Sequence, residues 1–286
     1  MPESALKIRP MTRAELDVVV DWAAAEGWNP GWHDADTFHA ADPGGFLLGL
    51  IGGEPVSAIS AVRYGNRFAF IGFYMVRPDF RGQGHGIAIW RAAMQRLAGR
   101  TIGLDGVVAQ QQSYRRSGFE LAWNNVRYEG RATHDGRVGD AIVPIGSAVS
   151  ELSDLLTYDA AFFPDDRRGF VRHWVAQTGS MTLAIRDGEG RLTGYGVIRP
   201  CRIGWKVGPL FADDADGADR LLRALMSHAA PDDAIQLDIP AGNRRALALV
   251  RAHGMRPVFE TARMYAGPTP DLPIDRIFGI TTFELG

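Results

Sequence analysis

The chain has a single cysteine, Cys201, among its 286 residues. A lone cysteine excludes an intrachain disulfide and a cysteine-rich zinc site. The seven histidines are scattered and show no His-x-x-x-His spacing, so we expect no metal. No apolar run approaches ~20 residues, and the N-terminus lacks the apolar core of a signal peptide. We therefore expect a cytoplasmic protein without a membrane partner.

Excess charge of either sign is also lacking. The 31 Lys and Arg residues against 33 Asp and Glu residues leave a net charge of -2, which gives no reason to expect nucleic acid as a partner. The apolar fraction of 46% and the charged fraction of 22% are typical of a soluble globular protein. The length suits one large domain or two of ordinary size.

One stretch stands out by its order of residue types. Residues 70–76 are apolar and aromatic and predict a buried strand, which Pro78 ends because proline cannot donate to the ladder. Small and apolar residues from Ile87 onward recur at helical spacing. The glycine-rich residues 81–86 between them therefore lie at a helix N-terminus, where free backbone N–H groups and the helix dipole favour a phosphate or pyrophosphate. The loop matches neither a P-loop nor the Rossmann Gly-x-Gly-x-x-Gly order.

This loop, Arg81-x-x-Gly84-x-Gly86, resembles the acetyl-CoA signature Arg/Gln-x-x-Gly-x-Gly/Ala of the GCN5-related N-acetyltransferase superfamily. The alternative is an ordinary strand-to-helix turn. A second motif of that superfamily, Tyr-x-x-x-Gly-Phe, is matched by Tyr114 to Phe119. The expected order of elements in residues 6–130 is also that of the superfamily. The resemblance implies an α/β fold of the α+β type, built on a mixed sheet.

The pattern repeats after a polar connection at residues 130–143. Expected helices and strands follow in the same order, and Gly118-Phe119 falls 136 residues before Gly254-Met255. We therefore predict two tandem units similar to this superfamily, each with a central, mostly antiparallel sheet flanked by helices. Residues 1–132 form the catalytic domain, and residues 133–286 form a second domain that covers or shapes the acceptor site.

The second unit has lost the chemistry of the first. Its strand-to-helix junction, residues 208–215, lacks the glycine signature and carries Asp213 and Asp214 where an anion would lie. Val250 stands at the counterpart of Tyr114. We predict a degenerate repeat, and the whole chain resembles bacterial tandem acetyltransferases.

The resemblance also implies a set of cofactor contacts. Met75 and Val76 would bind the pantetheine arm of acetyl-CoA (coenzyme A), and a backbone N–H of one of them would be available to the oxyanion. Ser113, near the end of a flanking strand, is a further candidate contact to coenzyme A. The residues assigned to the pyrophosphate are Arg81, Gly82, Gln83, Gly84, His85 and Gly86.

Tyr114 matches the tyrosine that protonates the coenzyme A sulfur in the superfamily. A phenol with a pKa of about 10 keeps its proton at neutral pH and can act as that donor. The alternative is that Tyr114 packs as an ordinary amphipathic residue of a short helix.

The general base is harder to assign, because residues 70–76 contain no carboxylate where many members carry a glutamate. Glu26, after the first helix, is the candidate: it could take the amine proton, act through water, or bind a cationic amine. It could also be a solvated helix end, and the amine could arrive neutral or lose its proton to a water chain. Trp28, Asn29 and Tyr74 are candidate substrate-binding residues, with core packing as the alternative for Trp28.

The sequence thus predicts an acetyl-CoA-dependent N-acetyltransferase that transfers an acetyl or other short acyl group to an amine by direct attack on the thioester. A small-molecule amine is the expected acceptor, and an antibiotic-modifying enzyme would differ only in that acceptor. The alternative is a non-catalytic acyl-CoA-binding sensor or scaffold. The chain is expected to be a monomer or a homodimer, and its sequence does not choose the acceptor or the acyl length.

Overall fold

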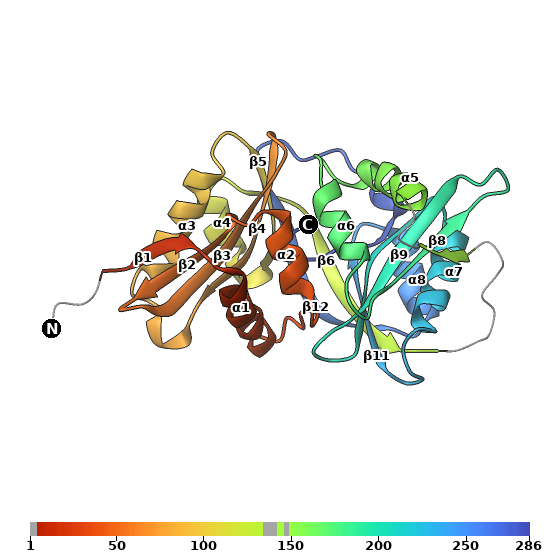
Figure 1. Ribbon diagram of the computed structural model, residues 1–286, viewed down its shortest axis with the longest axis horizontal. Helices are drawn as coiled ribbons and strands as arrows, with labels where there is room; N and C mark the ends of the chain where they lie inside the picture. Colours follow the sequence, from red (N-terminus) through yellow and green to blue (C-terminus); the bar gives the residue numbers. More distant parts are fainter. Residues whose placement is uncertain (1–4, 134–141, 146–148) are drawn as a thin grey trace.

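The computed structural model describes residues 5–133, 142–145 and 149–286. Figure 1 shows two lobes side by side, the first in red to yellow and the second in green to blue. The expected connection at residues 130–143 lies partly outside the described residues, at 134–141.

The first unit follows the predicted order of elements. Its first helix begins at a capping box, in which the Thr12 side chain accepts from the backbone of Glu15 and the Glu15 side chain accepts from the backbone of Thr12. The elements are β1 (Lys7–Pro10), α1 (Arg13–Ala25), α2 (Asp34–Ala41), β2 (Phe46–Ile51), β3 (Glu54–Tyr64), β4 (Phe68–Val76), α3 (His85–Arg96), β5 (Thr101–Val107), α4 (Gln111–Arg116) and β6 (Glu120–Arg131).

The second unit repeats that order, which confirms the predicted tandem organisation. Asp214 caps α7 by accepting from the backbone of Gly217, so the acidic junction serves as a helix start. The elements are β7 (Ile142–Pro144), α5 (Val149–Asp159), α6 (Arg168–Val175), β8 (Met181–Arg186), β9 (Leu192–Pro200), β10 (Trp205–Ala212), α7 (Ala215–Met226), β11 (Ala234–Pro240), α8 (Arg244–Ala252), β12 (Arg256–Ala266) and β13 (Ile277–Gly279).

The two units share one continuous mixed sheet, where we had expected a central sheet within each unit. Its strand order is β1-β2-β3-β4-β5-β12-β6-β11-β10-β9-β8-β7, and β13 pairs with β10. The cause is an exchange of strands: β12 of the second unit pairs with β5 of the first, and β6 of the first unit pairs with β11 of the second. Both exchanged strands lie at the centre of the molecule (Figure 1).

The exchange has internal two-fold symmetry. In the antiparallel ladder between β6 and β12, Asn125 lies opposite Thr261, and the two residues are 136 positions apart. The pairs on either side, Arg127 with Phe259 and Trp123 with Arg263, are related by the same offset of 136. The repeat that the sequence suggested is therefore a structural repeat about the Asn125–Thr261 pair.

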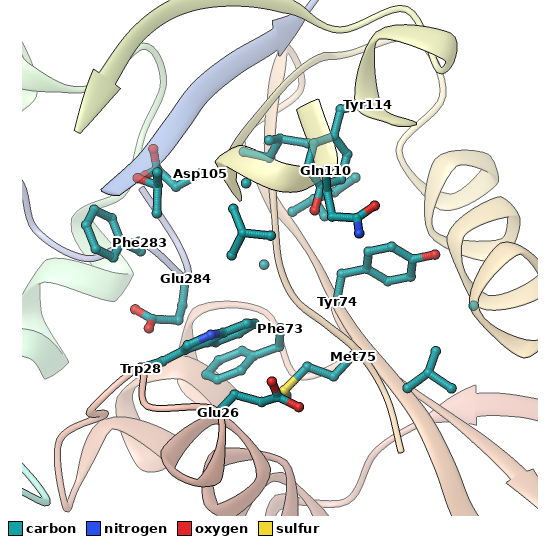
Figure 2. Close-up of a pocket in the computed structure, with 18 of the residues that line it drawn as sticks. Glu26, Trp28, Phe73, Tyr74, Met75, Asp105, Gln110, Tyr114, Phe283 and Glu284 are labelled. Carbon is teal, nitrogen blue, oxygen red and sulfur yellow. The ribbon is translucent and has the colours of Figure 1, made fainter. Parts of the chain in front are cut away.

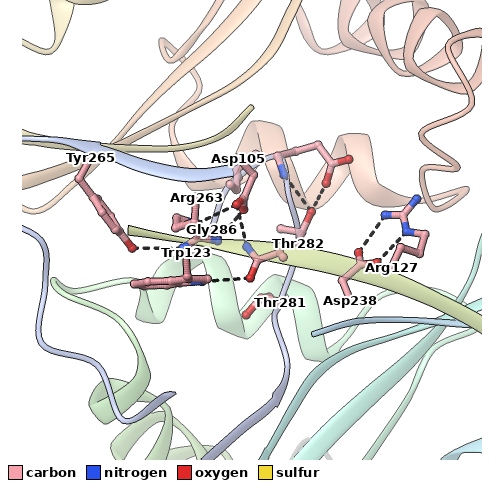
Figure 3. Close-up of polar contacts among 12 residues, drawn as sticks. Asp105, Trp123, Arg127, Asp238, Arg263, Tyr265, Thr281, Thr282 and Gly286 are labelled. Atoms are coloured by element: carbon pink, nitrogen blue, oxygen red, sulfur yellow. Dashed lines mark hydrogen bonds and ion pairs between the residues drawn. The ribbon is translucent and has the colours of Figure 1, made fainter. Parts of the chain in front are cut away.

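Each exchanged strand carries an arginine that pairs with an aspartate of the other unit. Arg263 of β12 donates to both carboxylate oxygens of Asp105 on β5, at 2.9 and 2.6 Å. Arg127 of β6 donates to both oxygens of Asp238 on β11, at 2.7 and 2.8 Å. All four side chains are buried, and Figure 3 shows both pairs. Without the exchanged strand, each unit would hold a buried aspartate that has lost its arginine, and an unpaired buried charge is costly.

The parallel strand pairs open into clefts at equivalent places. β4 and β5 pair only as far as Ile71 and Leu104, and β10 and β11 only as far as Val207 and Leu237. In the second unit β13 occupies this place, because it pairs with β10 and the following residue, Ile280, donates its N–H to the carbonyl of Asp238 on β11. The second cleft is thus filled by the chain itself.

The chain then continues from β13 toward the first unit. A Cβ atom added to Gly72 on β4 would lie 2.2 Å from the carbonyl oxygen of Glu284. Only glycine permits this approach of two backbones. The residues after β13 therefore link the filled cleft of the second unit to the open cleft of the first.

We expect Arg127→Met to lower the free energy of unfolding by about 3–5 kcal/mol, because it leaves the Asp238 carboxylate buried without its partner. The double variant Arg127→Met/Asp238→Leu should recover most of that loss, since it removes both charges. Urea unfolding followed by circular dichroism compares the two. A double variant as unstable as the single one would contradict the assigned role of the charge pair.

Gly72→Ala should lower the free energy of unfolding by about 1–3 kcal/mol, because its methyl group meets backbone atoms of Glu284 that have no rotamer to change. Gly169→Ala in α6 is the matched control. A Cβ there meets nothing within 4 Å, so the change should stabilise the chain by up to about 1 kcal/mol. Equal effects of the two changes in urea unfolding would refute the close approach at Gly72.

Candidate active site

The cleft of the first unit begins at an irregularity in β4. Phe73 has φ +46°, in the left-handed region that a bulky residue rarely adopts, and the pairing of β3 with β4 shifts register at this point. Such a bulge re-aims the backbone where pairing stops. The backbone of residues 72–76 therefore faces the cleft without a partner from β5, as the resemblance implied for Met75 and Val76.

The predicted anion-binding loop lies where β4 leads into α3. Gly84 is the N-cap of α3 with φ +86°, and no side chain caps the helix. Gly82 also has a positive φ, of +77°. A Cβ at Gly86 would lie 2.9 Å from the Tyr74 hydroxyl oxygen, so glycine keeps the backbone close to β4. The uncapped N–H groups of the first turn fit a pyrophosphate.

Glu26 and Arg81 meet at the rim of the cleft. The Arg81 guanidinium donates to a Glu26 carboxylate oxygen at 2.6 Å and to the carbonyl of Val76 at 3.0 Å. The two charged side chains are 55% and 44% exposed. This ion pair joins the end of α1 to the loop, so the two candidate residues are neighbours.

Tyr114 lies on α4 at the inner wall of the cleft and is 7% exposed. Its ring packs 5.6 Å from that of Trp90 and covers Gly106, where a Cβ would approach a ring carbon to 2.2 Å. Burial, with a smaller contribution from Tyr74, raises the pKa of Tyr114 to about 12. The phenol therefore keeps its proton at neutral pH and is able to donate it.

These elements enclose a cavity of about 620 Å³ (Figure 2). Most of the residues predicted for the site line it: Glu26, Trp28, Tyr74, Met75, Val76, Arg81, Gly82, Gly84, Gly86 and Tyr114. Burial raises the pKa of Tyr74 also.

Four predicted residues do not line the cavity. Asn29 is 5% exposed, and its side chain bonds across the joint between the units, to the backbone of Ile203 and the side chain of Gln236. It is a structural residue there, because φ +52° and these bonds hold its turn. Gln83 donates to the carbonyl of Asp79, and Ser113 bonds to the side chains of Gln110 and Arg116. His85 is the first residue of α3.

The second unit supplies cavity residues that the sequence did not reveal. They are Phe259 and Thr261 of β12 and Phe283 and Glu284 of the segment after β13. Figure 2 shows Phe283 and Glu284 beside Trp28. Asp105 and Gln110 of the first unit also line the cavity. Only the strand exchange brings the residues of β12 here, and no motif in the sequence marks it.

No helix within the described residues is long and apolar enough to cross a membrane. Among those residues there is also no group of three or more His, Cys, Asp or Glu side chains arranged to hold a metal ion.

Comparison with known proteins identifies both halves. Residues 13–119 match the Acetyltransferase (GNAT) family, and residues 155–279 match a second family described as an Acetyltransferase (GNAT) domain. The holothin acyltransferase of Pseudoalteromonas sp. (strain SANK 73390) is 28% identical over 278 residues, which cover 97% of this chain and 94% of that protein.

Solved structures share the fold over nearly the whole chain. A protein of Pyrococcus horikoshii, provisionally assigned as an acetyltransferase, superposes with a TM-score of 0.83 at 23% identity, over 98% of this chain and 96% of that one. A tandem GNAT protein from the clavulanic acid biosynthesis pathway superposes with a TM-score of 0.64 at 15% identity, over 93% of this chain and 100% of that one. With the matched domains and the acyltransferase relative, the chain belongs to the GCN5-related N-acetyltransferase (GNAT) superfamily and is an acyltransferase with two tandem GNAT domains.

Proposed function

We propose that the chain transfers an acetyl or other short acyl group from coenzyme A to an amine of a small molecule, by direct attack of the amine on the thioester. One observation carries this proposal. The unpaired backbone of β4, the uncapped start of α3 and the buried phenol of Tyr114 all line the same cavity. Members of the family use an acyl-CoA co-substrate, and these are the groups that such a substrate needs.

The residues have separate tasks in this proposal. The N–H groups around Gly84 and Gly86 hold the pyrophosphate, with Arg81 as a fixed cation. The backbone of Met75 and Val76 holds the pantetheine arm in an extended form and leaves an N–H for the oxyanion. This positioning turns the thioester carbonyl toward the acceptor side of the cavity.

Tyr114 gives its proton to the departing thiolate. Its pKa of about 12 keeps the phenol protonated throughout the neutral range, so the donor is available at working pH. The phenol is reprotonated after the thiol leaves, so the residue is not consumed.

The acceptor side is closed by the second unit. Phe259, Thr261, Phe283 and Glu284 line the cavity together with Trp28 and Glu26, and the backbone of Glu284 lies against Gly72 of β4. A cavity of about 620 Å³ that is lined by side chains of both units suits a small-molecule acceptor. A relative named for one compound, holothin, supports the same choice.

Thiol release from acetyl-CoA with a panel of small primary amines, together with calorimetric binding of acetyl-CoA, tests the proposal. We expect turnover by the wild type and a fall of about 100-fold in kcat for Tyr114→Phe, with nearly unchanged acetyl-CoA affinity, because only the proton donor is removed. Tyr128→Phe is the matched control, since that ring packs on the core of the second unit.

Equal turnover by Tyr114→Phe would remove the acid role. Tight acetyl-CoA binding by the wild type without turnover of any amine would favour the acyl-CoA sensor instead.

A further inference from the structure

Three carboxylates line the active cavity: Glu26, Asp105 and Glu284. Glu26 makes an ion pair with Arg81 at the rim, at 2.6 Å. Asp105 is held by both arms of Arg263 and also accepts from the side-chain amide of Asn125 at 2.7 Å. Each of these two carboxylates is therefore already engaged by an arginine.

Glu284 differs from both. It is 4% exposed, and among the described residues no arginine or lysine forms an ion pair with it. Its one side-chain hydrogen bond comes from the hydroxyl of Thr282, two residues away. Figure 2 shows its carboxylate between Phe283 and Trp28, on the acceptor side of the cavity. A carboxylate can accept several hydrogen bonds, so a buried carboxylate with a single hydroxyl donor has free capacity to accept from a ligand.

The charges that face Glu284 come from two strands. Arg127 on β6 and Arg199 on β9 both interact with it electrostatically without a hydrogen bond. Arg127 is committed to Asp238 and Arg199 to Asp34, each through two hydrogen bonds. Each of these arginines therefore has an aspartate of its own, and neither donates a hydrogen bond to Glu284.

The segment that carries Glu284, residues 280–286, is held in place at both of its ends. β13 fills the cleft of the second unit, and Arg167 donates to Thr281 and to the carbonyl of Gly286, at 3.1 Å each. The backbone of Glu284 itself rests against Gly72 of β4. Packing therefore positions the carboxylate before any acceptor binds, as a catalytic group requires.

Thr261 offers a second unused polar group at the same wall. It is 2% exposed, it lines the cavity, and its hydroxyl has no hydrogen-bond partner among the described residues. A buried polar group without a partner is unusual and points to a ligand. Thr261 and Glu284 are thus two polar residues of the second unit in the cavity wall.

We propose that Glu284 is the catalytic carboxylate that binds the acceptor's ammonium group and takes its proton. The proposal rests on the acyltransferase function proposed above and assigns the base that β4 lacks. The ammonium gives one proton to Glu284, and the free amine attacks the thioester carbon, so that the carbon–nitrogen bond forms and the carbon–sulfur bond breaks. The thiolate takes the proton of Tyr114. The surplus proton on the new amide nitrogen returns to Tyr114 through solvent, and Glu284 releases its own proton to solvent.

The test measures thiol release from acetyl-CoA with the amine that the wild type turns over best, from pH 6 to pH 10. Glu284→Gln should lower kcat about 100-fold or more at neutral pH, and its activity should rise with pH toward that of the wild type, because the amine then arrives uncharged. Glu284→Asp keeps a carboxylate and should retain more activity than Glu284→Gln at neutral pH.

Controls separate this role from a structural one. Calorimetric binding of acetyl-CoA and the thermal midpoint should stay close to those of the wild type in Glu284→Gln. The exposed Glu189→Gln, in the turn between β8 and β9, makes the same chemical change outside the site and should leave kcat and its pH profile unchanged. Glu26→Gln should raise the KM for acetyl-CoA, through Arg81, without the rescue at high pH.

The outcomes are distinct. If the wild type is active and Glu284→Gln has the same kcat at neutral pH, this inference is wrong and the proposed function stands. If kcat falls in Glu284→Gln and does not recover at high pH, Glu284 is not the base. If only Glu26→Gln shows a fall in kcat that recovers at high pH, Glu26 is the base. A wild type that turns over no amine removes the proposed function and this inference with it.

Discussion

The two buried Arg–Asp pairs of the exchanged strands join each unit to a strand of the other. Each arginine lies on the exchanged strand of one unit and each aspartate on the strand that borders the cleft of the other. Neither unit can therefore keep its central strands without a strand from its partner, because an unpaired buried charge is costly. The pairs place Arg263 opposite Asp105 and Arg127 opposite Asp238, which favours the observed register of β12 on β5 and of β6 on β11.

The exchange of strands decides which residues line the cavity. Since β12 borders β5, residues near position 260 reach a cleft whose other lining residues lie mostly at positions 71–114. The segment after β12 then passes through the cleft of the second unit and ends beside the cleft of the first. The second unit carries no glycine-rich signature at residues 208–215, and its equivalent cleft is filled by β13. Its side chains on β12 and after β13 line the cavity of the first unit.

Local patterns predicted most of the fold, and each has a local cause. The capping box at Thr12 and Glu15 marks the start of α1, and Pro78 lies two residues after the end of β4. The loop from Arg81 to Gly86 depends on glycines whose backbone geometry and space are set within a few residues. Asn29 shows the limit of this reasoning. It lies next to Trp28 in a turn that borders the cavity, yet its side chain bonds to residues more than 170 positions away.

The sequence by itself determined the element order, the tandem repeat, the glycine-rich loop at the start of α3 and the short helix that carries Tyr114, because all of these depend on hydrophobic periodicity, turn residues and short motifs. Only the tertiary structure decided that the sheet is continuous, that the strands are exchanged and that Thr261 and Glu284 face the cavity. The residue pattern of a strand predicts which of its faces is buried, but it does not predict which strand pairs with it. That choice depends on pairing between residues more than 100 positions apart, as between Arg127 and Asp238, and on the burial of charge that such pairing permits.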